Sequence, residues 1–522
     1  MVDKSGSDIK NKSTSLDNNQ GVGRVVDPST TPGGASKDDN SNSSTTPMQV
    51  VSEKKDDYPY YDYSGLGDEE EFTYKPKVGF TFGKVAKILG PVLILLLIIV
   101  PIVFVVLKLR AGNPKVVSKK GEIVWLGLGL KKEVVQPLID EYISKNPQAK
   151  IDYIEDSPTD YKERLVNSML QGKGPDVFTY HNSWVPMLKD FLDIMPADVM
   201  SYDDFAKVYY PVMVGNLTTG AGIVGLPLEY DGITLFINED IFSTAGKIAP
   251  TTWDEFHQIA IDLTTRNDKN VIIQSGAALG ITSNVDYWPE IIALLLLQSK
   301  ANMYNPQGQG TEEALSYYAD FYTFDKVWDS TLPSSTQAFA EGKLAMLLAP
   351  TKAVSEIKNL NGSLRFKSVP LPQVRRDNPD EPDVSYATYW VQGVWNKSPN
   401  KELAWDFLKF LSKKESLEEI YKNSTVAGLV GMAYPRIDMR DELISDPIMG
   451  SIVALAPDSK SWYLMSKTND GEEGLNTLLD AVFQTGLDSL SATKNRKGVT
   501  HVVETIDEDS ARVYTKFGIG PQ

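Results

Sequence analysis

The side chains able to do chemistry in this sequence are mainly aromatic rings and carboxylates. Cysteine is absent, and the three histidines, His181, His257 and His501, are scattered without metal-ligand spacing between any two of them. No phosphate-binding glycine loop, nucleophile elbow or His/Glu metal motif occurs. Two of the many carboxylates could form a glycosidase pair, but no pattern singles them out. We therefore expect no catalytic residue, no metal and no cofactor.

The charge and composition of the chain restrict its partners. The 522 residues carry a formal net charge of −17, and aromatic residues make up 10% of them. Such an acidic balance argues against nucleic-acid binding, which requires a basic face for the phosphates. Without cysteine the chain can form no disulfide, and it cannot carry the acylated cysteine that anchors many bacterial surface proteins. Any membrane attachment must come from the polypeptide itself.

One apolar run near the amino terminus predicts such an attachment. Ile88 to Leu107 reads ILGPVLILLLIIVPIVFVVL, a run without a single charge and long enough to cross a bilayer as a helix. Lys108-Leu109-Arg110 follows at the place where a cleaved signal peptide would have small residues. We therefore predict a retained transmembrane anchor helix at 84–110, with residues 88–107 in the lipid bilayer.

Two polar segments flank this predicted anchor. Residues 1–83 are rich in Ser, Thr, Asn, Asp and Gly, so we expect a disordered, acidic N-terminal tail. Within it, Tyr58 to Tyr74 combines tyrosines with a run of acids, which fits either a solvated linker or a docking motif for a cytoplasmic partner. Residues 111–120 are read as a linker. Lysines lie on both sides of the anchor, so the positive-inside rule gives no orientation.

The rest of the chain alternates between strand and helix patterns. Gly121 to Gly127 (GEIVWLG) is typical of a buried strand, Lys131 to Lys145 has an apolar helical stripe, and Ile151 to Ile154 is a second strand. A helix from Asp160 to Leu170 leads to a third strand that opens at Pro175-Asp176-Val177-Phe178-Thr179. This alternation predicts an α/β fold with a parallel sheet and helices on both faces. Roughly 400 residues suffice for two lobes.

Tyr180, Asn182 and Trp184 directly follow this third strand. Open α/β sheets bind ligands beyond the carboxyl ends of their parallel strands. The loop that carries these three residues is therefore placed to contact a ligand. The alternative for Trp184 is a ring that packs beneath the next helix, as most buried aromatic residues do.

Five stretches of residues 121–522 resemble the family 1 extracellular solute-binding proteins, the group that contains maltose-binding protein. The most specific, GLPLEYDGITLFINEDIF, is similar to the family's crossover between two lobes, although Ile237 replaces the usual tyrosine before Asn238. Thr252 and Glu255 in another stretch form the capping box of a helix. The five stretches are Gly172–Phe178, Gly225–Phe242, Pro250–Phe256, Ala338–Leu348 and Ala387–Leu411.

The resemblance implies a periplasmic-binding-protein-like clamp of two α/β lobes, joined by crossover hinge strands near Asp231, Tyr389 and Pro447. A small ligand, a mono- or oligosaccharide, would bind between the lobes outside the cell, and an ABC transporter permease would receive it. The chain would then be a single-pass protein of the bacterial cell membrane, with a cytoplasmic tail and an extracytoplasmic solute-binding domain. The expected lobes are about 121–230 with 390–446, and about 231–389 with 447–522.

The same resemblance places rings and polar groups in the cleft. An aromatic ring lies against the C–H face of a pyranose, while carboxylates and amides bond its hydroxyls. In the family a polar residue near Asp231 bonds a ligand hydroxyl, and Trp390 is the best stacking candidate. The predicted ligand-binding residues are Tyr180, Asn182, Trp184, Tyr230, Asp231, Tyr287, Trp288, Trp390, Trp462 and Tyr463.

Two alternatives stay open. The family's tryptophan after the Ala338–Leu348 strand is missing, and the chain continues Ala349-Pro350-Thr351-Lys352. The ligand could therefore be a polyamine, sugar phosphate or peptide, and Lys352, Arg375 and Arg376 would matter for an anionic one if they lie near the cleft. The other alternative is a ligand-sensing receptor domain with the same fold, although the tail shows no kinase, coiled coil or repeat.

Overall fold

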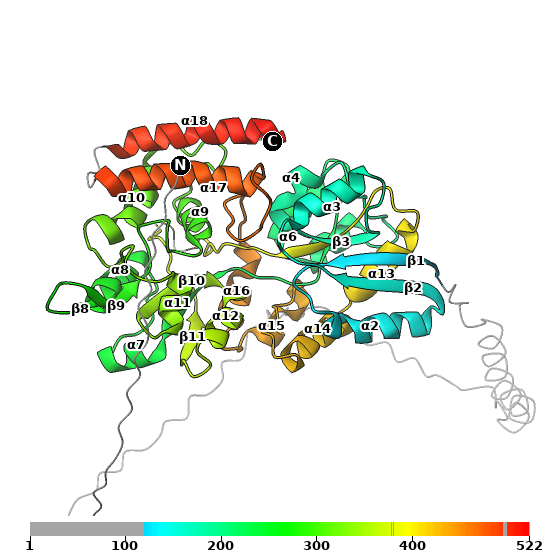
Figure 1. The fold of residues 1–522 in the computed structure, drawn as a ribbon, viewed down its shortest axis with the longest axis horizontal. Helices are drawn as coiled ribbons and strands as arrows, with labels where there is room; N and C mark the ends of the chain where they lie inside the picture. Colours follow the sequence, from blue (N-terminus) through cyan, green and yellow to red (C-terminus); the bar gives the residue numbers. More distant parts are fainter. Residues whose placement is uncertain (1–118, 377, 379, 494–497, 521–522) are drawn as a thin grey trace, which may run out of the picture. The chain divides into compact units, whose positions relative to one another are not determined.

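The computed structural model of the protein describes residues 119–376, 378, 380–493 and 498–520. All of them belong to one compact unit, which consists of two lobes, each built on its own β-sheet (Figure 1). The predicted tail and anchor helix, and nearly all of the predicted linker, lie outside the described residues. Among the described helices, none combines the length and the apolar character needed to cross a membrane.

The sheet of lobe 1 has the strand order β2-β1-β3-β12-β6. β1 pairs in parallel with β2 and β3, whereas β12 pairs antiparallel with β3 and β6. The expectation of a purely parallel sheet is therefore wrong, because β12 enters from the other lobe and runs back along the free edge of β3. The strands are β1 (Lys120–Gly127), β2 (Gln148–Glu155), β3 (Val177–His181), β6 (Leu226–Pro227) and β12 (Trp390–Val394).

Helices lie on both sides of this sheet, with α3 and α4 on one side and α2 and α14 on the other (Figure 1). The core between them is rich in large rings, among them Trp125, Trp184 and Trp405. The helices of lobe 1 are α2 (Lys132–Lys145), α3 (Tyr161–Leu170), α4 (Val185–Leu188), α5 (Tyr202–Val208), α6 (Pro211–Leu217), α13 (Lys401–Leu411), α14 (Lys414–Val426), α15 (Arg440–Leu443) and α16 (Gly450–Leu455).

The sheet of lobe 2 has the order β11-β7-β10-β9-β8 and is also mixed. β10 runs parallel to β9 and antiparallel to β7, which pairs antiparallel with β11. β7 and β10 are buried along their whole length, as their nearly unbroken apolar sequences ITLFIN and LAMLLAP require. The strands are β7 (Ile233–Asn238), β8 (Thr265–Arg266), β9 (Ile272–Ala277), β10 (Leu344–Pro350) and β11 (Phe366–Val369).

The capping box predicted for a helix of lobe 2 is confirmed. The hydroxyl of Thr252 accepts a hydrogen bond from the N–H of Glu255 at 3.2 Å, and the capping box is complete. The apolar run IIALLLL lies in α9 and is almost entirely buried. The helices are α7 (Glu239–Ala245), α8 (Trp253–Asp262), α9 (Trp288–Gln298), α10 (Gln309–Thr323), α11 (Ser335–Ala340), α12 (Ala353–Leu360), α17 (Leu475–Thr493) and α18 (Val499–Phe517).

Three chain segments run side by side where the lobes join. The N–H of Thr388 donates to the carbonyl of Asp231 at 3.0 Å, and the N–H of Ala387 donates to the carbonyl of Lys460 at 2.8 Å. The first two segments contain Asp231 and Tyr389, two of the expected crossover positions. A ribbon held by backbone hydrogen bonds therefore connects the lobes.

The third segment crosses later than the expected position at Pro447. Ile452 and Val453 of α16 pack in the core of lobe 1, whereas Leu464 packs in the core of lobe 2. The chain leaves lobe 1 only after α16 because the apolar side of this helix is buried there.

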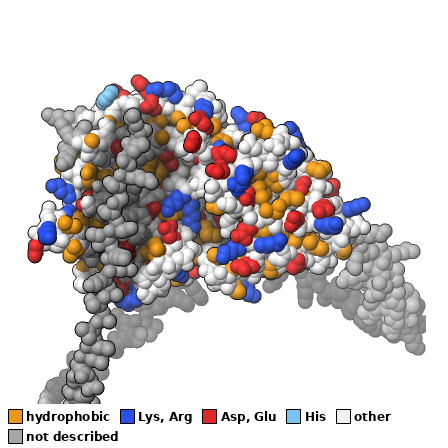
Figure 2. Space-filling view, viewed as in Figure 1, with side chains coloured by type: hydrophobic (Ala, Val, Ile, Leu, Met, Phe, Trp, Pro, Cys, Tyr) orange, Lys and Arg blue, Asp and Glu red, His pale blue; other side chains and the backbone are white. Residues whose placement is uncertain are grey.

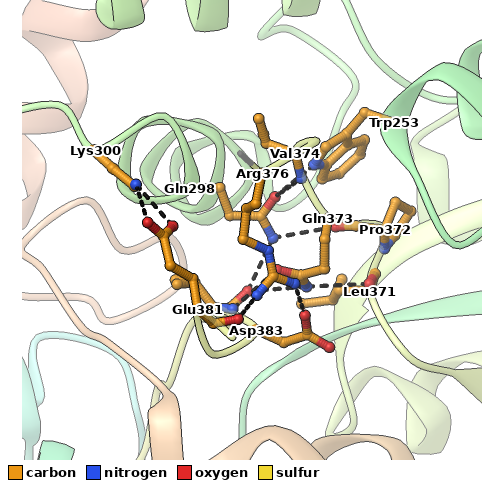
Figure 3. Close-up of polar contacts among 11 residues, drawn as sticks. Trp253, Gln298, Lys300, Leu371, Pro372, Gln373, Val374, Arg376, Glu381 and Asp383 are labelled. Carbon is orange, nitrogen blue, oxygen red and sulfur yellow. Dashed lines mark hydrogen bonds and ion pairs between the residues drawn. The ribbon is translucent and has the colours of Figure 1, made fainter. Parts of the chain in front are cut away.

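A buried amide fixes the start of the second crossing on lobe 2. Gln298, at the end of α9, accepts a hydrogen bond from the indole N–H of Trp253 at 2.6 Å and donates to the carbonyl of Val384 at 2.9 Å (Figure 3). It also donates to the carbonyl of Pro372 at 3.1 Å. Since both halves of the amide have partners, segment 370–384 is held against α9 before it reaches the crossing.

Candidate ligand-binding site

A cavity of about 460 Å³ lies between the two lobes. Lobe 1 contributes the loop after β3 and the end of α6, and lobe 2 contributes the segment after the third crossing and the residues that follow α18. The lining is uncharged apart from Lys189, with aromatic rings beside amides and hydroxyls. Its polar and aromatic side chains include Asn182, Ser183, Lys189, Asn216, Thr218, Tyr304, Ser461, Trp462 and Tyr463.

Polar contacts join the lobes along this cavity. The hydroxyl of Ser183 donates to the amide oxygen of Asn476 at 2.8 Å, and the amide N–H of Asn182 donates to the hydroxyl of Ser461 at 2.8 Å. The ammonium of Lys162 also donates to a backbone carbonyl of lobe 2. The lobes are therefore in direct contact, and both of them border the cavity.

The predicted pair Trp462 and Tyr463 borders the cavity with partly exposed rings. Tyr304 lies edge-on to Trp462, with 4.7 Å between ring centroids. The indole N–H of Trp462 donates to the hydroxyl of Tyr514 at 2.9 Å, which fixes the ring. Asn182, Trp462 and Tyr463 are thus the three predicted residues that the structure brings together in one cavity.

Trp184 and Trp390 form an edge-to-face pair in lobe 1, with centroids 5.5 Å apart. Trp184 is fully buried, as in the alternative interpretation from the sequence, and its indole N–H has no hydrogen-bond partner within the described ranges. Trp390 remains partly exposed and lies edge-on to His181 at 5.1 Å. Trp390 is therefore the ring of this pair that keeps accessible surface.

Tyr180 and Tyr230 lie in the core of lobe 1 rather than at the cavity. The hydroxyl of Tyr180 donates to the carbonyl of Val224 at 3.2 Å, and the ring of Tyr230 packs on Tyr210. Burial raises the pKa of both phenols. Neither ring borders the 460 Å³ cavity.

Asp231 is buried at the first crossing, and both oxygens of its carboxylate accept hydrogen bonds from the protein. One oxygen accepts hydrogen bonds from the N–H of Gly232 and from the N–H and hydroxyl of Thr351, and the other accepts from the N–H of Lys352 at 3.1 Å. Burial raises the pKa of Asp231, against the opposing effects of the Lys352 charge and these donors. This network ties the crossing strand to the start of α12.

Two charged residues beside this network were not predicted as a pair. Glu229 precedes the crossing in lobe 1, and Lys352 directly precedes α12 in lobe 2. Burial and the charge of Asp231 raise the pKa of Glu229 to about 7, while Lys352 opposes this shift. Burial and the charge of Lys352 lower the pKa of His181. The charge of Lys352 therefore acts on Glu229 and His181, which belong to lobe 1, although Lys352 itself belongs to lobe 2.

Tyr287 and Trp288 open α9 in lobe 2, and both are buried. The ammonium of Lys467 lies 4.5 Å from the centroid of the Tyr287 ring and 3.4 Å from the carboxylate of Asp286. The ring of Tyr287 is therefore covered by a cation of the same lobe.

Two buried carboxylates hold the segment that follows Trp462 and Tyr463. Glu290 of α9 accepts hydrogen bonds from the N–H and the hydroxyl of Ser466 at 2.9 and 2.8 Å. One oxygen of Glu290 and one of Asp480 on α17 are buried without a hydrogen-bond partner in the described part of the chain. Burial raises the pKa of both carboxyl groups, and the charge of Glu290 raises that of Asp480 further.

Arg375 and Arg376 lie away from the space between the lobes. Arg376 forms an ion pair with Asp383 of the same segment (Figure 3). Arg375 borders a cavity that is lined by residues 249–252, 369–371 and 373–376 with Asp383, all of them in lobe 2. Of the three basic residues singled out for an anionic ligand, only Lys352 lies at the junction of the lobes.

Sequence reasoning missed Asn216, Tyr304 and Ser461, which complete the cavity lining. Tyr304 and Asn216 lie in stretches without a motif, so no local signal could have found them. Ser461 immediately precedes the predicted Trp462, and Glu229 immediately precedes Tyr230. Both residues lie next to residues that the family resemblance predicted, but only the folded structure shows that they belong to the site.

Comparisons with known proteins agree with this fold. A family model described as bacterial extracellular solute-binding protein matches residues 137–447, more than half of the chain. No curated protein sequence matches the chain.

Several solved structures share the two-lobe architecture at low sequence identity. The sugar-binding protein MalE of Xanthomonas citri is 19% identical with a TM-score of 0.60, and the match covers 77% of this chain and 100% of that one. A solute-binding protein of Thermotoga lettingae, solved with α-D-tagatose, is 18% identical with a TM-score of 0.58 over 76% and 100%. An ABC substrate-binding protein of Listeria monocytogenes, in complex with cycloalternan, is 16% identical with a TM-score of 0.57 over 77% and 100%.

Proposed function

The chain belongs to the family of bacterial extracellular solute-binding proteins, and from this we propose that it captures a saccharide between its two lobes outside the cell. The lobes close on the ligand by hinge motion at the crossing segments. The closed form then delivers the ligand to the permease of an ABC transporter. The similar structures from Thermotoga lettingae and Listeria monocytogenes hold sugars, which supports a saccharide as the ligand class.

One observation carries this proposal: the 460 Å³ cavity combines aromatic and neutral polar side chains from both lobes. Trp462, Tyr463 and Tyr304 offer ring surface for the C–H face of a sugar. Asn182, Asn216 and several hydroxyls offer donors and acceptors for its rim of hydroxyl groups. A ligand that touches both walls binds the closed form better than the open form, and so shifts the population toward closure.

We propose further that residues 88–107 hold this binding domain at the cell membrane, with residues 1–83 in the cytoplasm. The apolar length of this run supports a span. Tethering keeps the binding domain near a permease in the same membrane at high effective concentration. The span would replace the lipid anchor that a chain without cysteine cannot carry.

Ligand capture is tested by thermal unfolding of the full-length chain, kept in mild detergent, against neutral sugars, acidic sugars, polyamines and peptides. A ligand at about a hundred times its dissociation constant should stabilise the protein by about 2.7 kcal/mol. Stabilisation by a saccharide supports the proposal. Stabilisation by polyamines or peptides alone contradicts the saccharide assignment, and no stabilisation by any class contradicts ligand capture.

The membrane topology has its own test, because the natural chain contains no cysteine. Single cysteines are introduced in the tail (Ser36→Cys) and in an exposed turn of lobe 2 (Lys269→Cys), and intact cells receive a membrane-impermeant maleimide. The proposal expects labelling at position 269 only. Labelling at position 36 in intact cells overturns the proposed orientation.

A further inference from the structure

His181, the last residue of β3, is a fully buried histidine whose two ring nitrogens both have partners. Its Nδ1 lies 2.8 Å from the hydroxyl oxygen of Ser183, and its Nε2 lies 2.9 Å from the hydroxyl oxygen of Thr388 in the second crossing segment. Ser183 lines the 460 Å³ cavity, whereas His181 does not. The ring therefore connects a crossing segment to a residue of the candidate site.

The amide of Asn476 in lobe 2 decides which of these groups donates. Its N–H donates to the carbonyl of Tyr463 at 2.8 Å, so its oxygen faces Ser183 and accepts from the Ser183 hydroxyl at 2.8 Å. A serine hydroxyl has one hydrogen, so its contact with His181 uses a lone pair of the hydroxyl oxygen. These partners place the ring hydrogen on Nδ1 and leave Nε2 to accept from Thr388.

The opposite tautomer would break this contact between the lobes. Burial and the charge of Lys352 lower the pKa of His181, so near neutral pH the ring carries one hydrogen only. With that hydrogen on Nε2, Nδ1 would accept from the Ser183 hydroxyl, and the oxygens of Ser183 and Asn476 would face each other as two acceptors. The backbone N–H of Ser183 suits that arrangement, but its 3.4 Å contact with Nδ1 is longer than the two 2.8 Å contacts.

A second chain of hydrogen bonds runs beside the first. The N–H of Tyr389 donates to the amide oxygen of Asn182 at 3.2 Å, and the amide N–H of Asn182 donates to the hydroxyl of Ser461 at 2.8 Å. Both chains start at neighbouring residues of the second crossing and end in segment 461–463, which carries Trp462. On the face shown in Figure 2, basic and acidic side chains are interspersed, whereas both chains consist of neutral groups. Their contacts are therefore not of the kind that salt screens.

We propose that His181 is a positioning residue for ligand capture, whose Nδ1–H tautomer directs the Ser183 hydroxyl across to Asn476 and so stabilises the closed lobes. The inference rests on the proposed function and adds to it a residue that does not line the cavity. The apparent affinity for a ligand rises with the fraction of the protein that is already closed. His181 thus raises affinity through Ser183 rather than by contact with the saccharide.

The tautomer is tested by nitrogen-15 NMR of the full-length chain in mild detergent, with only the histidines labelled. The chain has three histidines, so the signals of His181 are those that disappear in the His181→Asn variant. We expect a hydrogen-bearing Nδ1 and a bare Nε2, two kinds of ring nitrogen that resonate far apart. A hydrogen on Nε2 instead overturns the inference, whichever ligand the protein binds.

Lobe closure is tested by the distance between spin labels on two introduced cysteines, Gln171→Cys directly after α3 in lobe 1 and Glu472→Cys before α17 in lobe 2. Both positions are exposed, and neither borders the cavity. His181→Leu keeps bulk but no donor, and should lower the ratio of closed to open protein about fivefold, the loss of one hydrogen bond. His181→Asn keeps a donor near the position of Nδ1 and should recover part of this loss.

The same pair of substitutions in a Ser183→Ala chain identifies the partner of His181. There His181→Leu and His181→Asn should give equal distances, because no hydroxyl remains to be positioned. His257→Asn, on α8 of lobe 2, is the matched control and should leave the distances unchanged.

The inference fails if the two His181 variants behave alike when Ser183 is present, as a loss of packing alone would produce. It fails equally if neither variant changes the distances. No readout here uses a saccharide, so saccharide capture stands or falls on its own thermal test.

Discussion

The backbone N–H and the hydroxyl of Thr351 both donate to the same carboxylate oxygen of Asp231, each at 2.8 Å. This relationship ties the first crossing strand to the end of β10, where α12 begins. With the N–H groups of Gly232 and Lys352, the carboxylate accepts four hydrogen bonds, which is about its full capacity. We infer from this geometry that the Asp231 carboxylate positions Lys352 and the start of α12 at the hinge.

Replacing Asp231 by Asn should destabilise the protein. The amide keeps one acceptor oxygen but places an NH2 group against either Lys352 or Thr351, so a buried N–H loses its acceptor. We expect a loss of about 2 kcal/mol in the free energy of unfolding, the usual cost of such a buried unpaired group. Urea unfolding of both chains measures it. Asp268→Asn, in an exposed turn, is the control, and equal stability of all three chains would refute the positioning role.

Glu229 should make stability depend on pH. Its pKa is raised to about 7 in the folded protein, from 4.5 for an ordinary glutamate, so between these values the folded state binds more protons than the unfolded state. Stability should therefore fall as pH rises from 4.5 to 7 and no further above it. The Glu229→Gln variant should lose less stability across this window than the natural chain, as thermal unfolding at pH 5, 6, 7 and 8 would show. Parallel curves for the two chains would contradict the raised pKa.

Glu290→Gln should stabilise the protein at pH 8. The glutamine oxygen can still accept the two hydrogen bonds from Ser466, while the buried carboxylate, whose pKa is raised by burial, is replaced by a neutral group. We expect a higher midpoint temperature at pH 8 and a smaller difference at pH 5. Glu290→Leu removes the hydrogen bonds to Ser466 as well, so it should be less stable than Glu290→Gln. The opposite order would mean that the Ser466 contact contributes nothing.

The contact between Ser183 and Asn476 should favour the closed form. Ser183→Ala removes a hydrogen bond between the lobes and leaves the amide of Asn476 short of one donor. Loss of roughly 1 kcal/mol of closure energy should weaken saccharide binding about fivefold and enlarge the average dimensions seen by small-angle scattering. Ser168→Ala, which removes a hydrogen bond within α3 only, should change neither. Equal effects of both variants would show a general loss of stability instead.

Trp390 should contribute to binding by positioning the loop after β3. It does not line the 460 Å³ cavity, but its ring packs edge-on against His181 and Trp184, which flank the cavity residues Asn182 and Ser183. We expect Trp390→Ala to weaken saccharide binding about tenfold or more, the loss of one good buried contact, as titration calorimetry would measure. Trp390→Phe keeps a ring and should recover much of the affinity. Unchanged affinity in the alanine variant would show that Trp390 does not position this loop.

Much of the fold could be predicted because it follows from local patterns. The strand and helix alternation from Gly121 to Thr179 and the capping box at Thr252 appear in the structure as expected. These features depend on spacing along the chain, which a sequence displays directly. The direction of β12 was not predictable in this way, because strand pairing depends on how the chain returns from the other lobe.

The candidate site was predicted only in part. Asn182, Trp462 and Tyr463 meet at the first cavity, although 280 residues separate the first from the second. Tyr180 and Trp184 lie next to Asn182 in the sequence, but both are buried in the core of lobe 1, as is Tyr230. Neighbouring residues on strands and tight turns face opposite sides, so a motif indicates the place of a site and not which of its side chains reach it.

The sequence by itself determined the α/β class and the apolar run at 88–107, because short-range periodicity and composition encode them, and its motifs carried the resemblance that implied the family and its two lobes. Only the tertiary structure decided that the carboxylate of Asp231 accepts hydrogen bonds from Thr351 and Lys352, and that Asn182 and Trp462 line one cavity. These relationships join positions more than a hundred residues apart. Burial, the pairing of charges and the capacity of a carboxylate for hydrogen bonds become defined only when such distant segments are packed together.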